Sequence, residues 1–101
     1  MYKVNTSFVV EGCENNRWLN IINENYIPFL KENGFNQVCL SRVLSAENES
    51  NFTYSLLVDI DNIADYEKLT GVIFDEYTAV AEPLFGARVV WFTTVMKVLN
   101  E

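Results

Sequence analysis

The stretch that decides the fold of this 101-residue chain is FTYSLLVDI, residues 52–60. Its hydrophobic residues Phe52, Tyr54, Leu56, Val58 and Ile60 alternate with Thr53, Ser55, Leu57 and Asp59. Successive side chains of a strand point to opposite faces of a sheet, so this alternation predicts a strand with one buried face. Asp61 and Asn62 follow at once, and either side chain is suited to cap the start of a helix.

Two further strands and a helix are predicted before this stretch. Residues 2–10 alternate in the same way, and residues 37–45 have the composition of a second strand. Between them, apolar residues recur at helical spacing over residues 18–30. Glu14 or Asn15 is expected to cap this helix.

A second helix and a last strand are predicted after it. Polar residues 46–51 form a hairpin loop that leads into the central strand. Apolar residues then recur at helical spacing over residues 63–84, and Pro83 and Gly86 are expected to end this helix. Residues 88–99 are rich in β-branched and aromatic side chains, which is typical of a strand.

The order of the predicted elements is β-α-β-β-α-β, with no linker, repeat or low-complexity segment. This order predicts an α+β, ferredoxin-like fold over residues 1–101 as a single domain. The rules for chain connections favour one four-stranded antiparallel sheet with both helices on the same face. We expect the first and third strands to lie next to each other in the middle of the sheet.

The first predicted helix contains a proline, Pro28. A proline inside a helix removes a backbone hydrogen bond and costs about 3 kcal/mol. We therefore expect the helix to kink or break near Ile27, which turns Phe29 and Leu30 onto the sheet.

The chain has 14 acidic and 7 basic residues and a net charge of −7. The basic residues are scattered singly, whereas binding to phosphates needs clusters of Lys and Arg. We therefore expect neither nucleic acid nor an anionic membrane surface as a partner. No apolar run approaches the roughly 18 residues of a membrane helix, and the first residues lack a secretory signal. We expect a cytoplasmic protein with reduced Cys13 and Cys39.

The chain has no histidine, which excludes Ser-His-Asp and Cys-His catalysis and histidine ligands to zinc or haem. It has neither a GxGxxG motif nor a P-loop. Asp59, Asp61, Asp65 and Glu67 superficially resemble a calcium loop but lack its glycine turn and its final bidentate glutamate. We expect these acids to cap a helix, and we expect no metal and no cofactor.

The predicted helices cover one face of the sheet and leave the other face free. Side chains expected on that second face are small, polar or aliphatic with almost no formal charge: Asn5, Ser7, Val9, Cys39, Ser41, Val43, Thr53, Ser55, Leu57, Trp91, Thr93 and Val95. Such a surface suits the inside of a dimer or the lining of a cavity. The alternative is an ordinary hydrated face. We favour a covered face because the last strand is apolar on both sides.

A series of short markers, in order along nearly the whole chain, has a recognisable pattern. They are Tyr2 and Val4 of an N-terminal Tyr-x-Val strand, Trp18, Ile27-Pro28, Gly34-Phe35, Ser41-Arg42-Val43-Leu44, Thr53-Tyr54-Ser55, Asp65-Tyr66-Glu67, Phe85-Gly86-Ala87-Arg88 and Phe92-Thr93-Thr94-Val95. With these markers the chain resembles a small bacterial family known only as a domain of unknown function, which is similar to the dimeric α+β barrel proteins. The resemblance implies a homodimer in which two sheets face each other and enclose a barrel-like space.

The wider superfamily includes cofactor-independent monooxygenases, haem-degrading enzymes and small-molecule binders. Two positions depart from the family pattern: Tyr26 stands where the family has a His, and Thr93 where it has an Arg. A phenol with a pKa near 10 exchanges protons poorly at neutral pH. Thr93 also lacks the fork with which Arg holds a carboxylate or phosphate. The resemblance therefore implies a binding or structural member of the family.

Three hypotheses follow for the function. The first is a homodimer, formed through the sheet face, whose cavity binds a small, mostly apolar molecule. Its candidate lining residues are Asn5, Ser7, Cys39, Ser55, Trp91 and Thr93, with Tyr26 near the mouth. The second is a cofactor-independent monooxygenase or isomerase acting on an aromatic or polyketide-like substrate. The third is a structural or regulatory module whose partner fills the second face.

Overall fold

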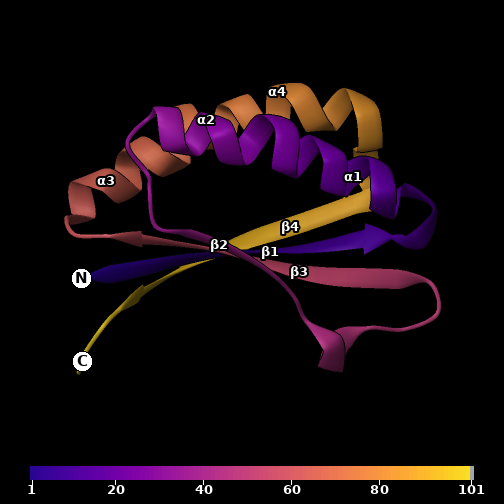
Figure 1. Ribbon diagram of the computed structural model, residues 1–101, viewed down its shortest axis with the longest axis horizontal. Helices are drawn as coiled ribbons and strands as arrows, with labels where there is room; N and C mark the ends of the chain where they lie inside the picture. The colour runs from indigo at the N-terminus through magenta and orange to yellow at the C-terminus, as the bar shows by residue number, and fades with distance from the viewer. Residues whose placement is uncertain (101) are drawn as a thin grey trace.

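The strand predicted at residues 52–60 is β3, Asn51–Ile60, and it lies inside a four-stranded sheet (Figure 1). The computed structural model, which describes residues 1–100, places β1 (Tyr2–Glu11) beside β3. Strands β2 (Val38–Arg42) and β4 (Val89–Lys97) form the two edges, and every pairing is antiparallel. The predicted adjacency of the first and third strands is confirmed.

The helices all lie on one face of this sheet, as Figure 1 shows. They are α1 (Asn15–Ile21), α2 (Ile27–Glu32), α3 (Ile63–Lys68) and α4 (Phe74–Phe85). The prediction of an α+β, ferredoxin-like architecture is thereby confirmed. Over residues 1–100, no helix combines the length and the hydrophobicity that crossing a membrane requires.

Both helical segments contain a π-helical turn. One turn, Ile22–Tyr26, joins α1 to α2, and the other, Leu69–Ile73, joins α3 to α4. A π-turn replaces the i to i−4 hydrogen-bond pattern by a wider one. Pro28 stands in the first turn of α2, directly after this interruption, where its missing N–H costs little. The predicted distortion near Ile27 is present as a widened turn.

The end of the second helical segment agrees with the prediction only in part. Pro83 and Gly86 were expected to end the helix, but α4 continues through Pro83 to Phe85. Pro83 and Ala79, whose carbonyl loses its N–H partner, are both solvent-exposed, so water can satisfy that carbonyl. Gly86 ends the helix, as predicted, with a φ of +53° that favours glycine.

The two helix starts also differ from each other. Asn62 caps α3, because its side-chain oxygen accepts a hydrogen bond from the N–H of Ala64 at 2.9 Å. At α1 the predicted cap is wrong, since neither Glu14 nor Asn15 caps the helix with its side chain. Glu14 pairs with two arginines, and Asn15 accepts a hydrogen bond from a tyrosine hydroxyl of β3.

Strand β2 is shorter than the predicted strand at residues 37–45. It ends at Arg42, and Leu44–Ala46 form a 3-10 turn in which Leu44 is exposed. The side chain of Asn48 accepts hydrogen bonds from two backbone N–H groups at the start of β3, both at 2.8 Å. This local turn shapes the hairpin loop and carries the chain away from the sheet.

The predicted register of the last strand is wrong by one residue. Trp91 pairs with Phe8, and Thr93 pairs with Thr6, which places both on the face that the helices cover. Val95 pairs with the buried Val4 and falls on that same face. The hydrophobic alternation was uninformative here because β4 is apolar on both of its sides. The residues of β4 that lie on the second face are instead Val90, Phe92, Thr94 and Met96.

Aromatic rings fill the layer between sheet and helices. Phe8 of β1 packs against Trp18 of α1 and Tyr77 of α4, with ring centroids 5.0 and 5.3 Å apart. The Trp18 Nε1–H donates a hydrogen bond of 3.1 Å to the Tyr77 hydroxyl, so the buried indole is satisfied. Trp91 meets Tyr77 edge to face at 5.6 Å. This cluster joins both helical segments to the sheet.

Replacing the helix proline tests the role of the first π-turn. We expect Pro28→Ala to keep the fold and to change the free energy of unfolding by less than about 1 kcal/mol, because the hydrogen-bond pattern is already interrupted before this residue. Urea denaturation followed by circular dichroism measures the change. A variant that fails to fold would contradict this account, since the proline would then be essential to the helix.

Candidate functional site

The face of the sheet opposite the helices has no helix over it, and we call it the open sheet face (Figure 1). The strand pairings place these side chains on it: Lys3, Asn5, Ser7, Val9, Glu11, Cys39, Ser41, Asn51, Thr53, Ser55, Leu57, Asp59, Val90, Phe92, Thr94 and Met96. Lys3 and Asp59 form an ion pair of 3.0 Å, and Glu11, at the end of β1, is the only other charged member of this set. The rest of the surface is therefore neutral.

A hydrogen-bonded polar cluster lies at the middle of the open sheet face. The hydroxyl of Ser55 donates to the side-chain oxygen of Asn5, and the Asn5 amide donates to the Ser7 hydroxyl at 3.1 Å. Ser7 and Ser55 face each other on the two central strands, and Ser41 follows across β2. Three small side chains thus lie side by side in one row across the sheet, and Phe92 of β4 continues this row beyond Ser7.

Larger apolar side chains flank this polar cluster. On β4, Val90, Phe92 and Met96 are 55%, 62% and 43% exposed, although each is hydrophobic. Val9 and Leu57 on the central strands are half-buried. Exposed apolar side chains gathered on one face mark a surface suited to contact with another molecule.

The structure separates the predicted lining residues into two groups. Asn5, Ser7, Cys39 and Ser55 lie on the open sheet face. Trp91 and Thr93 do not, since Trp91 packs under the helices and the Thr93 hydroxyl lies 3.1 Å from that of Thr6. Tyr26 lies in the helix layer on the other side of the sheet.

The thiol of Cys39 is exposed. The reason is its place on the short edge strand β2, where the open sheet face has no cover. Its sulfur lies 3.7 Å from the hydroxyl oxygen of Ser41.

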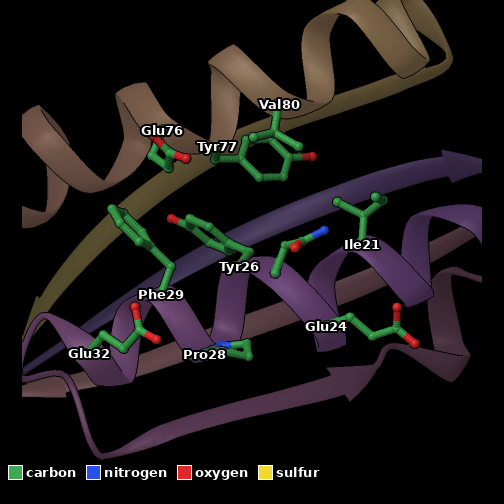
Figure 2. A pocket seen from close by; sticks show the side chains of 10 residues that line it. Ile21, Glu24, Tyr26, Pro28, Phe29, Glu32, Glu76, Tyr77 and Val80 are labelled. Atoms are coloured by element: carbon green, nitrogen blue, oxygen red, sulfur yellow. The ribbon is translucent and has the colours of Figure 1, made fainter.

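Tyr26 contributes to a different feature, a groove of about 370 Å³ between the α1–α2 segment and α4 (Figure 2). Its lining residues are Ile21, Glu24, Asn25, Tyr26, Pro28, Phe29, Glu32, Glu76, Tyr77 and Val80. We call it the interhelical groove. The sequence did not predict it, because the acids of α4 have the pattern of an ordinary hydrated helix surface. The available signal was Tyr26 itself, an aromatic residue among polar neighbours.

The two tyrosines of the interhelical groove are buried phenols. Their rings meet edge to face at 5.1 Å. Burial raises the pKa of Tyr77 from 10.0 to about 12, and burial raises the pKa of Tyr26 well above its ordinary range. Both hydroxyls therefore keep their protons at neutral pH. Among the described residues, no group of three His, Cys, Asp or Glu side chains is suited to a metal ion.

Comparison with known families identifies the family of this chain. The model of the DUF4286 domain, a domain of unknown function, matches residues 1–99. The chain belongs to the DUF4286 family. The predicted membership of a family of unknown function is confirmed, and a comparison of the DUF4286 chain with curated proteins finds no match.

Solved structures similar to the DUF4286 chain share its fold. One is a dimeric ferredoxin-like protein from an uncultured marine organism, with 18% identity, a TM-score of 0.62, and 100% of this chain and 97% of that one covered. A second dimeric ferredoxin-like protein, also from an uncultured marine organism, has 12% identity and a TM-score of 0.60. The match covers 99% of this chain and 96% of that one. A third is CPII of Thiomonas intermedia K12 bound to ADP, AMP and acetate, with 16% identity and a TM-score of 0.51. The match covers 98% of this chain and 90% of that one.

The buried phenols predict an alkaline loss of stability in the DUF4286 chain. Tyr77 binds its proton more tightly in the folded chain, where its pKa is about 12, than in the unfolded chain, where its pKa is 10.0. Its contribution is therefore complete below the unfolded pKa and is lost as the pH rises through the folded one. We expect the free energy of unfolding, from urea titrations between these values, to fall with pH. Tyr77→Phe should reduce the slope, and an identical slope in both proteins would contradict the assignment.

Proposed function

We propose that two copies of the DUF4286 chain associate through their open sheet faces and enclose a cavity that binds a small, mostly apolar molecule. The observation that carries the proposal is the open sheet face itself, a neutral surface with exposed apolar side chains around a polar centre. The first two structural neighbours are described as dimeric ferredoxin-like proteins, which supports the same assembly here.

The hydrophobic effect favours this association. Val90, Phe92 and Met96 expose apolar surface to water, and burying such surface contributes roughly 25 cal/mol per Å². A two-fold axis through the face places β4 of one copy against the apolar surface of the other, so both copies bury the same patch. The Lys3–Asp59 ion pair lies at one end of the strands and leaves the middle of the interface uncharged.

The shape of the face supports an enclosed space. Packed sheets lie about 10 Å apart, a distance that side chains of ordinary size fill. Ser7 and Ser55 are too small to fill it at the centre, whereas Leu57 and Phe92 around them are large enough to touch the partner. A hollow therefore remains over the polar cluster, walled by apolar side chains.

The chemistry of this hollow favours binding over catalysis. Asn5, Ser7 and Ser55 offer an amide and two hydroxyls, which orient a polar group of a ligand by hydrogen bonds but do not exchange protons at neutral pH. The one basic residue of the face, Lys3, is already paired. The nucleotides bound by the Thiomonas protein are consequently not the ligands that we propose, because their phosphates would lack a cation.

Substitution at the centre of the exposed apolar patch tests the dimer. We expect the wild-type protein at about 50 µM to have twice the chain mass of 11.6 kDa in light scattering, and Phe92→Glu to have the mass of one chain. Two glutamates buried in the interface would be uncompensated charges. Ile63→Glu is the matched control, because Ile63 is 48% exposed in α3, on the helix side.

The same measurement can contradict the dimer in two ways. A wild-type protein that remains monomeric at this concentration would exclude it. A dimer that persists in Phe92→Glu would place the interface on another surface.

A second substitution tests the cavity. We expect the wild-type dimer to bind Nile red, a neutral apolar dye, and Ser55→Leu to lose at least about tenfold in affinity because the larger side chain fills the hollow. Thr53→Leu makes the same kind of change on the same face outside the polar cluster and should leave binding intact. Fluorescence titration measures the affinity. A dimer that binds no dye would show that the interface is filled, and the binding part of the proposal would fail.

A further inference from the structure

The interhelical groove lies on the opposite side of the sheet from the proposed dimer interface. One wall comes from Tyr26 and from Phe29 and Glu32 of α2, and the other comes from Glu76 and Tyr77 of α4 (Figure 2). Its volume of about 370 Å³ falls in the range of ligand pockets, roughly 300–1,000 Å³. Because the helices face away from the sheet-to-sheet interface, the groove stays open to solvent in the dimer.

The charges around the groove have one sign. Three carboxylates line it, those of Glu24 and Glu32 on one wall and Glu76 on the other, and no Lys or Arg does. Within residues 1–100 none of the three carboxylates forms an ion pair. The groove therefore attracts a cation and repels an anion.

The phenol of Tyr26 is a second and independent indication of a ligand. Tyr26 is only 5% exposed, and its hydroxyl forms no hydrogen bond with a described residue. The ring reaches from the first helical segment toward α4, as Figure 2 shows, and it lines the groove. The hydroxyl oxygen itself is accessible, because the described residues include no fully buried side-chain oxygen without a hydrogen-bond partner. It therefore faces the groove, where it can bond with a molecule that enters.

Tyr77 supplies the same kind of group from the opposite wall. Its oxygen accepts the hydrogen bond of Trp18, which leaves its own O–H free to donate. Burial raises the pKa of both phenols, so they remain neutral and do not compete with the carboxylates for the cation. The rings of Tyr26, Tyr77 and Phe29 also offer aromatic faces, which attract organic cations.

From these features we infer that the interhelical groove binds a small organic ammonium ion with an apolar body, such as an alkyl- or arylalkylamine. The ammonium group is held by the carboxylate of Glu76 and by the oxygen of Tyr26, and it has enough N–H donors for both. The apolar body packs on Phe29 and on the aliphatic wall made by Ile21 and Val80.

Calorimetry with three matched molecules tests this inference. Phenethylammonium is the cation, 2-phenylethanol its neutral analogue, and 3-phenylpropanoate its anionic analogue. We expect the cation to bind at least about tenfold more tightly than the alcohol, the anion to show no binding, and the affinity for the cation to fall as salt is added. Equal affinity for the cation and the alcohol, or no binding of the cation at about 10 mM, would overturn the inference.

Point variants locate the binding in the groove. Glu76→Gln and Tyr26→Phe should each weaken phenethylammonium binding by at least about threefold. Glu67→Gln removes an exposed carboxylate of α3 that does not line the groove, and it should leave the affinity unchanged. An equal loss in Glu67→Gln would show a nonspecific attraction to the acidic chain and would overturn the inference.

The monomer variant separates this site from the proposed dimer cavity. Phe92→Glu alters only the open sheet face, so it should bind phenethylammonium as the wild type does. Loss of binding in Phe92→Glu would place the amine between the sheets and contradict the groove. Retained binding supports the groove whether or not the wild-type protein is a dimer.

Discussion

The hydrogen bond from the Trp18 indole to the Tyr77 hydroxyl is the contact on which the rest of the structure depends. It joins α1 to α4 across the centre of the helix layer, and Phe8 of β1 packs against both rings. Each helical segment is interrupted by a π-turn and contains a proline, so neither is a regular helix held by its own backbone. In such segments tertiary packing of the buried face, more than helix propensity, supplies the stability.

Much of the fold could be predicted because β1 and β3 have one buried and one exposed face. Their alternation is strict, so the sequence determined which side chains meet the helices. Strand β4 is apolar on both sides, and nothing in its sequence distinguished Trp91 from Phe92 as the inward residue. The difference depends on which ring fits beside Phe74 and Tyr77, and only the packed helix layer provides that information.

The open sheet face was predicted in part from the sequence, whereas the interhelical groove was not predicted, and the reason is similar. Asn5, Ser7 and Ser55 share a face because of strand alternation, which is a local property of the sequence. The interhelical groove brings residues about fifty positions apart to opposite walls, and that pairing follows from the antiparallel sheet and the crossovers above it. Glu76 by itself has the pattern of a hydrated helix surface, and it gains significance only when Tyr26 stands across from it.

Alternation in the central strands also bears on how such a chain can evolve. Along β1, Thr6 and Phe8 belong to the buried layer, while Asn5 and Ser7 belong to the open sheet face. Adjacent residues of this strand are therefore under different selective constraints. A mutation at an even-numbered position of β1 affects packing and therefore stability. A mutation at an odd-numbered position changes only the surface that contacts partners or ligands. A lineage can therefore exchange partners or ligands by drifting at odd-numbered positions of this strand while the architecture is inherited unchanged.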